Sequence, residues 1–118
     1  MSVKVNTDAV KRAKSLIKDH KLDMESDWSK DQPSADEENK YLDQKGWSEY
    51  GKWYLAIDTD ENEDTKGRHK FPFGDFKQVH RDGLIAAKQR AAQNDYKSIE
   101  KAADDLLQMI DSREADKC

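Results

Sequence analysis

Basic and aromatic side chains alternate over residues 66–90, and this segment has the clearest potential for binding chemistry in the chain. Lysine and arginine hold phosphate groups while exposed rings stack on bases, so one interpretation is a nucleic-acid surface. The alternative is that the rings are core residues and the basic side chains pair with acidic residues of the same fold. Pro72 and the helical apolar pattern that follows it favour burial of the rings. The basic residues are Lys66, Arg68, Lys70, Lys77, Arg81, Lys88 and Arg90, and the rings are Phe71, Phe73 and Phe76.

The candidate binding residues of this segment are Lys77, His80, Arg81, Lys88 and Arg90. Arg81 and Lys88 are seven residues apart, so a helix would place them on one side, with Lys77 about one turn before Arg81. Arg90 would point about 180° away from Arg81 on the same helix. The spacing therefore predicts one basic face formed by three of these four cations.

Histidine is the residue type most often used for acid-base chemistry near neutral pH, and the chain has three: His20, His69 and His80. No two have the spacing that puts paired metal ligands on one helix face, so we expect no metal site. His80 falls on the apolar stripe of a predicted helix. This position is typical of a histidine at the rim of the core, satisfied by a neighbouring carbonyl or carboxylate.

An enzyme is nevertheless an open alternative for the region around His80. It requires a concave pocket that gathers His80, Arg81 and a carboxylate such as Asp75 or Asp82. The sequence contains no glycine-rich phosphate loop, nucleophile elbow or Cys/His pair, and its local patterns single out no carboxylate as buried and paired. We therefore expect a protein without catalytic machinery and without a cofactor.

The acidic segment from Asp58 to His69 matches a calcium-binding loop only in part. Asp58, Asp60 and Asn62 occupy its first, third and fifth positions. The sixth position is Glu63 instead of the glycine that the sharp turn needs, and the twelfth is His69 instead of a bidentate glutamate. We interpret the segment as a polar hairpin loop, and whether it binds a cation stays open.

The composition indicates one small domain with charges gathered in blocks. The chain has 118 residues, 35% hydrophobic and 39% charged, with a formal net charge of −4. Residues 1–18 carry a net charge of +4, residues 19–64 of −10, residues 65–90 of +5 and residues 91–118 of −3. Because acidic and basic blocks can neutralise each other, solvated and mutually paired faces are the simplest explanation. The isoelectric point near 5.4 is far below that of a dedicated nucleic-acid-binding domain.

The sequence also gives expectations about compartment. No apolar run is long enough to cross a bilayer, and residues 1–6 lack the apolar region of a signal peptide. The only cysteine, Cys118, has no partner for an intrachain disulfide. We expect a cytoplasmic protein without a membrane partner. The mean hydropathy of −1.16 further predicts that part of the chain buries little surface.

Apolar spacing and capping residues predict four helices, near residues 7–19, 35–45, 75–93 and 96–111. Ser34 and Glu37 form a capping-box pattern before the second helix, Gly46 can end it, and Asp75 can cap the third. Residues 52–58 and 68–72 are rich in strand-forming side chains. Pro72 lacks an amide hydrogen, which predicts that the second strand lies at an edge.

These elements predict an α+β fold in which a small two-stranded antiparallel sheet packs on a C-terminal antiparallel two-helix hairpin, with additional N-terminal helices. Residues 1–33 are expected to form an N-terminal helix that docks weakly, followed by a polar arm in which Trp28 alone is worth burying. Residues 34–111 form the globular core, and residues 112–118 a disordered tail. The predicted core residues are Trp53, Leu55, Ile57, Phe73, Val79, Leu84, Ile99, Leu106 and Ile110.

Three segments together resemble a group of small bacterial proteins of unknown function. They are Gly51–Asp58 (GKWYLAID), Lys70–Asp75 (KFPFGD) and Val79–Gln93, which contains VHRDGLIAA and RAAQ. A looser form of the same pattern is similar to the ends of some phage-associated proteins of unknown role. The resemblance covers about residues 47–110 and implies a strand pair leading into a two-helix hairpin. It implies no activity.

From these observations we expect a small non-catalytic binding or regulatory module, whose partner is a protein or an anionic ligand. A nucleic-acid-binding accessory protein that uses residues 66–90 is the first alternative. An enzyme with a pocket near His80 is the second. The sequence does not identify the ligand, the oligomeric state or the role of the first 46 residues.

Overall fold

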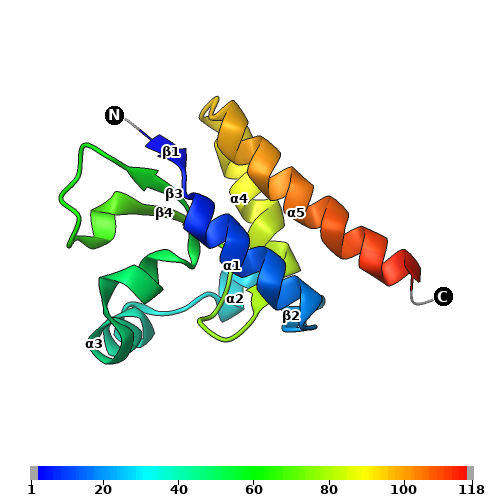
Figure 1. Cartoon of the computed structure of the whole chain (residues 1–118), viewed down its shortest axis with the longest axis horizontal. Helices are drawn as coiled ribbons and strands as arrows, with labels where there is room; N and C mark the ends of the chain where they lie inside the picture. Colours follow the sequence, from blue (N-terminus) through cyan, green and yellow to red (C-terminus); the bar gives the residue numbers. More distant parts are fainter. Residues whose placement is uncertain (1–2, 117–118) are drawn as a thin grey trace.

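The protein's computed structural model describes residues 3–116 and shows a mixed arrangement of helices and short strands (Figure 1). The α+β class predicted from the sequence is confirmed. The helices are α1 (Thr7–Lys18), α2 (Trp28–Asp31), α3 (Ala35–Gly51), α4 (Arg81–Gln93) and α5 (Lys97–Asp116). The strands are β1 (Val3–Val5), β2 (Leu22–Asp23), β3 (Tyr54–Asp58), β4 (His69–Pro72) and β5 (Val79–His80), and the 3-10 helix η1 spans Lys66–Arg68.

The sheet differs from the predicted strand pair. It has three antiparallel strands in the order β1-β3-β4, and β2 and β5 form a separate parallel pair. The register aligns Val3 with Asp58 and Tyr54 with Pro72. β4 is an edge strand, as the proline predicted, and residues 59–68 form the loop of its hairpin with β3.

The N-terminal helix belongs to the core, so the expectation that it docks weakly is wrong. Ala9, Ala13 and Ile17 of α1 are fully buried, and α1 packs against α5 and β3. A narrow stripe of small residues is enough here because alanine lets the neighbouring backbone approach closely. The observed arrangement of helices therefore differs from the predicted one, in which the N-terminal helices were additions to a C-terminal two-helix hairpin.

The α4–α5 pair stands beside this sheet, with its helices side by side along much of their length (Figure 1). Two ion pairs define its direction: Arg81 at the start of α4 contacts Asp111 late in α5, and Lys88 contacts Asp104. This order is that of antiparallel helices. Of the predicted core residues, all are buried except Ile57, which is half-buried.

Helix boundaries follow the predictions where local capping decides them. The capping box before α3 is present, with Ser34 Oγ accepting from the Glu37 N–H and the Glu37 carboxylate accepting from the Ser34 N–H. Gly46 has φ of 84°, but the helix resumes after it and ends at Gly51. Residues 112–116 continue α5, so the predicted tail is wrong for these residues. Its last two residues, 117 and 118, lie outside the described part.

The expected start of the third helix at Asp75 is also wrong, because α4 begins at Arg81. Asp75 Oδ1 accepts the N–H groups of Lys77 and Gln78, as a helix cap would. The chain instead turns at Phe76, whose φ is 69°, and forms β5 before the helix. Lys77 therefore lies outside the helix that carries Arg81 and Lys88.

Candidate functional site

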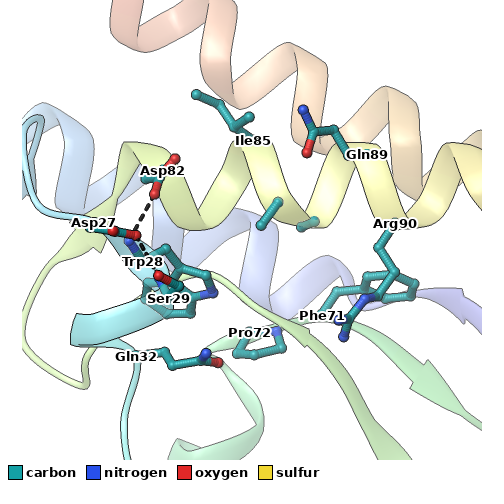
Figure 2. Close-up of a pocket in the computed structure, with 12 residues that line it drawn as sticks. Asp27, Trp28, Ser29, Gln32, Phe71, Pro72, Asp82, Ile85, Gln89 and Arg90 are labelled. Atoms are coloured by element: carbon teal, nitrogen blue, oxygen red, sulfur yellow. Dashed lines mark hydrogen bonds between the residues drawn. The ribbon is translucent and has the colours of Figure 1, made fainter.

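A groove of about 370 Å³ lies along one face of α4, between that helix, the short helix α2 and strand β4 (Figure 2). We call it the α4 groove. Its α4 wall includes Asp82, Ile85, Ala86, Gln89 and Arg90, whose spacing of three and four residues defines a single helix face. The facing wall is formed by Trp28 and Ser29 of α2, by Gln32 just after that helix, and by Phe71 and Pro72 of β4.

Helix α2 is held in place by carboxylates at its first residues. Asp27 caps it, with Oδ1 accepting from the Ser29 N–H at 3.0 Å. The backbone N–H of Trp28 donates to Asp82 Oδ2 at 2.8 Å. This second bond joins segments 54 residues apart and ties α2 to the start of α4. A four-residue helix is not stable by itself, so these contacts and the burial of Trp28 keep it folded.

Trp28 forms the centre of the facing wall. The residue is 6% exposed and packs over Gly83, where an added Cβ would come within 3.1 Å of two indole carbons. Figure 2 shows the indole nitrogen on the side of the ring toward Phe71, facing the groove. The structure shows no hydrogen bond from this N–H to another described residue, and the atom is not one of the buried unsatisfied groups, so it is open to solvent or to a ligand. It is therefore a donor presented to whatever fills the groove.

Arg90 provides the cation at the other end of the groove. Its side chain reaches from α4 toward Phe71 in Figure 2, and among the described residues it has no ion-pair partner. Asp82 lies eight residues earlier on the helix, which corresponds to about 12 Å along the axis. The groove thus has a carboxylate at one end, an unpaired guanidinium at the other and the indole N–H between them.

Phe71 is held in an unusual backbone conformation where it meets the groove. Its φ is 64°, in the left-handed region that a phenylalanine rarely adopts, and its ring contacts Tyr96 edge to face. Such a conformation costs about 1–3 kcal/mol and persists only where surrounding structure enforces it. Strained residues cluster at functional sites, so this observation supports the choice of the α4 groove as a candidate site.

The predicted basic residues are not brought together. Arg81 pairs with Asp111 at 3.2 Å and Lys88 with Asp104 at 2.8 Å, both across the α4–α5 interface. The hydrogen bond from Lys88 lowers the pKa of Asp104, and the same bond raises the pKa of Lys88. Arg90 lies in the α4 groove and Lys77 lines a different hollow. For Arg81 and Lys88, the structure therefore agrees with the alternative in which basic residues pair with acidic residues of the same fold.

His80 lies in a second hollow of about 300 Å³, and its ring contacts the ring of Trp28, which lines the α4 groove. It is 2% exposed, with Nε2 at 3.1 Å from Asp75 Oδ2 and Nδ1 at 3.9 Å from Asp23 Oδ2. His80 is therefore buried beside carboxylates, as expected. The rest of that expectation is wrong, because His80 lies in β5 before the helix and neither ring nitrogen makes a hydrogen bond with a described residue. The enzyme alternative requires a pocket that gathers His80, Arg81 and either Asp75 or Asp82. His80 and Asp75 lie together, but Arg81 pairs with Asp111 of α5, and Asp82 accepts from the backbone of Trp28.

Trp28, Phe71 and Asp82 build the α4 groove, and none of the three was among the candidate binding residues. One signal pointed to Trp28, which is the single large aromatic residue in a polar arm. No sequence pattern shows that it meets α4. Among the residues whose side chains are described, no cluster of three or more His, Cys, Asp or Glu is arranged to hold a metal ion.

Comparisons of the chain with protein-family models, curated proteins and solved structures found no match. The resemblance to small bacterial proteins therefore stays a prediction. Within the described residues, every helix is too short or too polar to cross a membrane.

Proposed function

We propose that this protein is a non-catalytic binding module that holds a small organic anion in the α4 groove. One observation supports this: the indole N–H of Trp28 and the exposed guanidinium of Arg90 line the same concave surface, and neither is bonded to another described side chain. Both groups can donate to the acceptor oxygens of a carboxylate or phosphate. The anionic group belongs at the Arg90 end, away from Asp82.

The walls favour a ligand with a flat apolar part. Phe71, Pro72, Ile85 and Ala86 provide apolar surface beside the two donors, and the volume of about 370 Å³ is that of a small-molecule site. Gln32 and Gln89 add amide groups that can accept or donate at the rim. This combination of apolar walls and a few directed polar groups is the usual composition of a ligand pocket.

A binding role is favoured over catalysis because the titratable groups are engaged in structure. Asp82 holds the Trp28 backbone, and His80, the residue most suited to proton transfer, is buried and does not line the α4 groove. The nucleic-acid alternative loses support because Arg81 and Lys88 are paired with α5. An enzyme near His80 remains the other alternative.

The proposal is tested by NMR titration of the ¹⁵N-labelled protein with benzoate, using the neutral benzamide as the ligand control. We expect benzoate to shift the indole signal of Trp28 more than those of Trp47 and Trp53. Arg90→Gln should weaken benzoate binding about tenfold, since a charge-assisted pair is lost. Lys40→Gln removes the same charge from an exposed position on α3 and should change little. Equal weakening by both variants would show general charge attraction and contradict the proposal.

A further inference from the structure

The hollow around His80 is strongly acidic. It is lined by four acidic residues, Asp23, Asp31, Glu37 and Asp75, and among the described residues Lys77 is the one lysine or arginine that lines it. We call it the acidic pocket. The Ser26 hydroxyl, which donates to Asp23 at 2.6 Å, holds the pKa of Asp23 below its usual value. Asp23 therefore stays ionised over the whole neutral range.

Two of these carboxylates are oriented by the turns that contain them. Asp75 Oδ1 accepts from the N–H groups of Lys77 and Gln78, and Asp23 Oδ1 accepts from Ser26 and Glu25. Asp75 Oδ2 lies 3.1 Å from His80 Nε2. Asp23 Oδ2 accepts from the Ser26 hydroxyl at 2.6 Å and from Gln78 Nε2 at 3.4 Å, and it lies 3.9 Å from His80 Nδ1. A ligand entering the acidic pocket meets oxygen atoms whose positions are already set.

His80 itself is a buried polar side chain without a satisfied nitrogen. It is 2% exposed, and in the described part of the chain neither ring nitrogen makes a hydrogen bond of acceptable geometry. The 3.1 Å approach of Nε2 to Asp75 fails on angle, and the 3.9 Å separation from Asp23 is too long. Buried polar groups almost always have partners, so an orphaned imidazole lining a pocket indicates a missing one.

We propose that the acidic pocket binds a primary alkylammonium group. An ammonium has three N–H donors and no acceptor. The acceptors around His80 are its imidazole, Asp75 Oδ2 and the carboxylate of Asp23, whose Oδ2 the ammonium would share with Ser26 and Gln78. Its charge is stabilised by four carboxylates, and the alkyl chain extends out of the hollow. This proposal does not rest on the anion proposed for the α4 groove, so either ligand can bind without the other.

Two features favour an amine over a metal ion. Among residues with described side chains, the carboxylates are not clustered as metal ligands. Calcium and magnesium also require six or more closely arranged oxygen ligands, whereas the imidazole nitrogen suits an N–H donor. The chain's own Lys77 is the natural competitor, since among the described residues it is the one lysine or arginine that lines the acidic pocket.

The test uses NMR of protein labelled with ¹⁵N at histidine, titrated with n-butylammonium at about pH 8, where free imidazole is neutral. We expect the His80 ring signals to shift while those of His20 stay in place. Tetramethylammonium has the same charge but no N–H donor, and it should bind at least about tenfold more weakly. Equal binding of the two ions, or no shift at His80, would overturn the proposal.

Variants locate the site. Asp75→Asn keeps an oxygen for the two turn N–H groups, so the fold is retained, and binding should weaken about tenfold. Lys77→Gln removes the internal competitor and should strengthen binding. Asp43→Asn, at an exposed position of α3, is the control for net charge and should have no effect. If Asp43→Asn weakens binding as much as Asp75→Asn, only general charge attraction is present and the proposal fails.

Two further titrations identify the source of the amine. N-acetyl-lysine methylamide represents the lysine side chain of a protein partner, and n-butylammonium represents a free small amine. Binding of both supports a lysine ligand, and binding of n-butylammonium alone supports a small amine. Preferential binding of calcium, detected by the same His80 signals, would replace the amine proposal with a metal site.

Discussion

The indole ring of Trp28 lies against the imidazole of His80, with the ring centroids 5.3 Å apart and the planes inclined at 55°. Trp28 lines the α4 groove and His80 lines the acidic pocket, so this ring contact joins the walls of the two hollows. Both hollows therefore depend on the position of α2, a helix of four residues. The hydrogen bond between Trp28 and Asp82 sets that position.

We expect Asp82→Ala to destabilise the protein by about 1.5–3 kcal/mol, because it removes a partly buried hydrogen bond to a charged acceptor. The contact between Trp28 and His80 should loosen at the same time. Urea unfolding measures the free energy, and the Trp28 indole signal reports the contact.

Asp111→Ala is the matched control for this variant. It breaks the exposed pair with Arg81, which contributes about 0–1 kcal/mol. If both variants cost the same free energy and leave the Trp28 signal unchanged, then Asp82 does not position α2.

Gly74→Ala should be strongly destabilising. A Cβ at this position would lie 2.5 Å from a ring carbon of Trp53 and 2.6 Å from the carbonyl oxygen of Gln78, and the second contact is with backbone. Overpacking of this kind costs about 1–3 kcal/mol. Gly67→Ala, whose nearest neighbour would be Glu61 at 3.7 Å, is the comparison and should be tolerated. Thermal unfolding of the two variants decides the point.

His69 should make stability depend on pH. Burial, with a smaller effect from Arg68, lowers the pKa of His69 from its usual 6.5. The unfolded chain therefore binds the proton more readily, and stability is complete above pH 6.5 and is lost as the pH falls below it. His69→Phe removes this titration.

The measurement is the free energy of unfolding in urea at several pH values from about 5 to 7.5, for the natural chain and for His69→Phe. The readout is the slope of the unfolding free energy against pH. The change in packing that the substitution causes shifts this free energy at every pH and does not change the slope. A slope that is the same in both proteins would contradict the prediction.

We expect no salt-sensitive retention of the protein on a DNA resin at about 50 mM salt, because Arg81 and Lys88 already pair with Asp111 and Asp104. Strong retention that disappears in the triple variant Lys77→Gln, Arg81→Gln and Lys88→Gln, with unchanged helical circular dichroism, would favour the nucleic-acid alternative. Arg90→Gln alone should not alter retention.

Local sequence patterns predicted structure well where neighbouring residues decide it. The Ser34–Glu37 capping box is confirmed because both hydrogen bonds lie within one helical turn. Asp75 shows the limit of such patterns. Its side chain accepts the same kind of N–H groups that a helix cap accepts, yet the chain forms a turn and then β5. Local hydrogen bonding is alike in both cases, so distant contacts decide between them.

The short strands could not be predicted for a related reason. β1 has three residues, and β2 and β5 have two each, too few to show a period. Each becomes a strand only through a partner far along the chain, as when Leu22 aligns with Val79. The same applies to α1, whose small apolar stripe is buried because α5 and β3 cover it.

By itself, the sequence determined the α+β class, most of the core and the longer helices, because apolar spacing and capping act over a few residues. Only the tertiary structure decided which charged groups are free. It pairs Arg81 and Lys88 with α5, leaves Arg90 in the α4 groove and places His80 between Asp23 and Asp75. Ion pairs and hydrogen bonds form between groups that are close in space, and a residue's neighbours along the chain do not determine which distant groups come close to it.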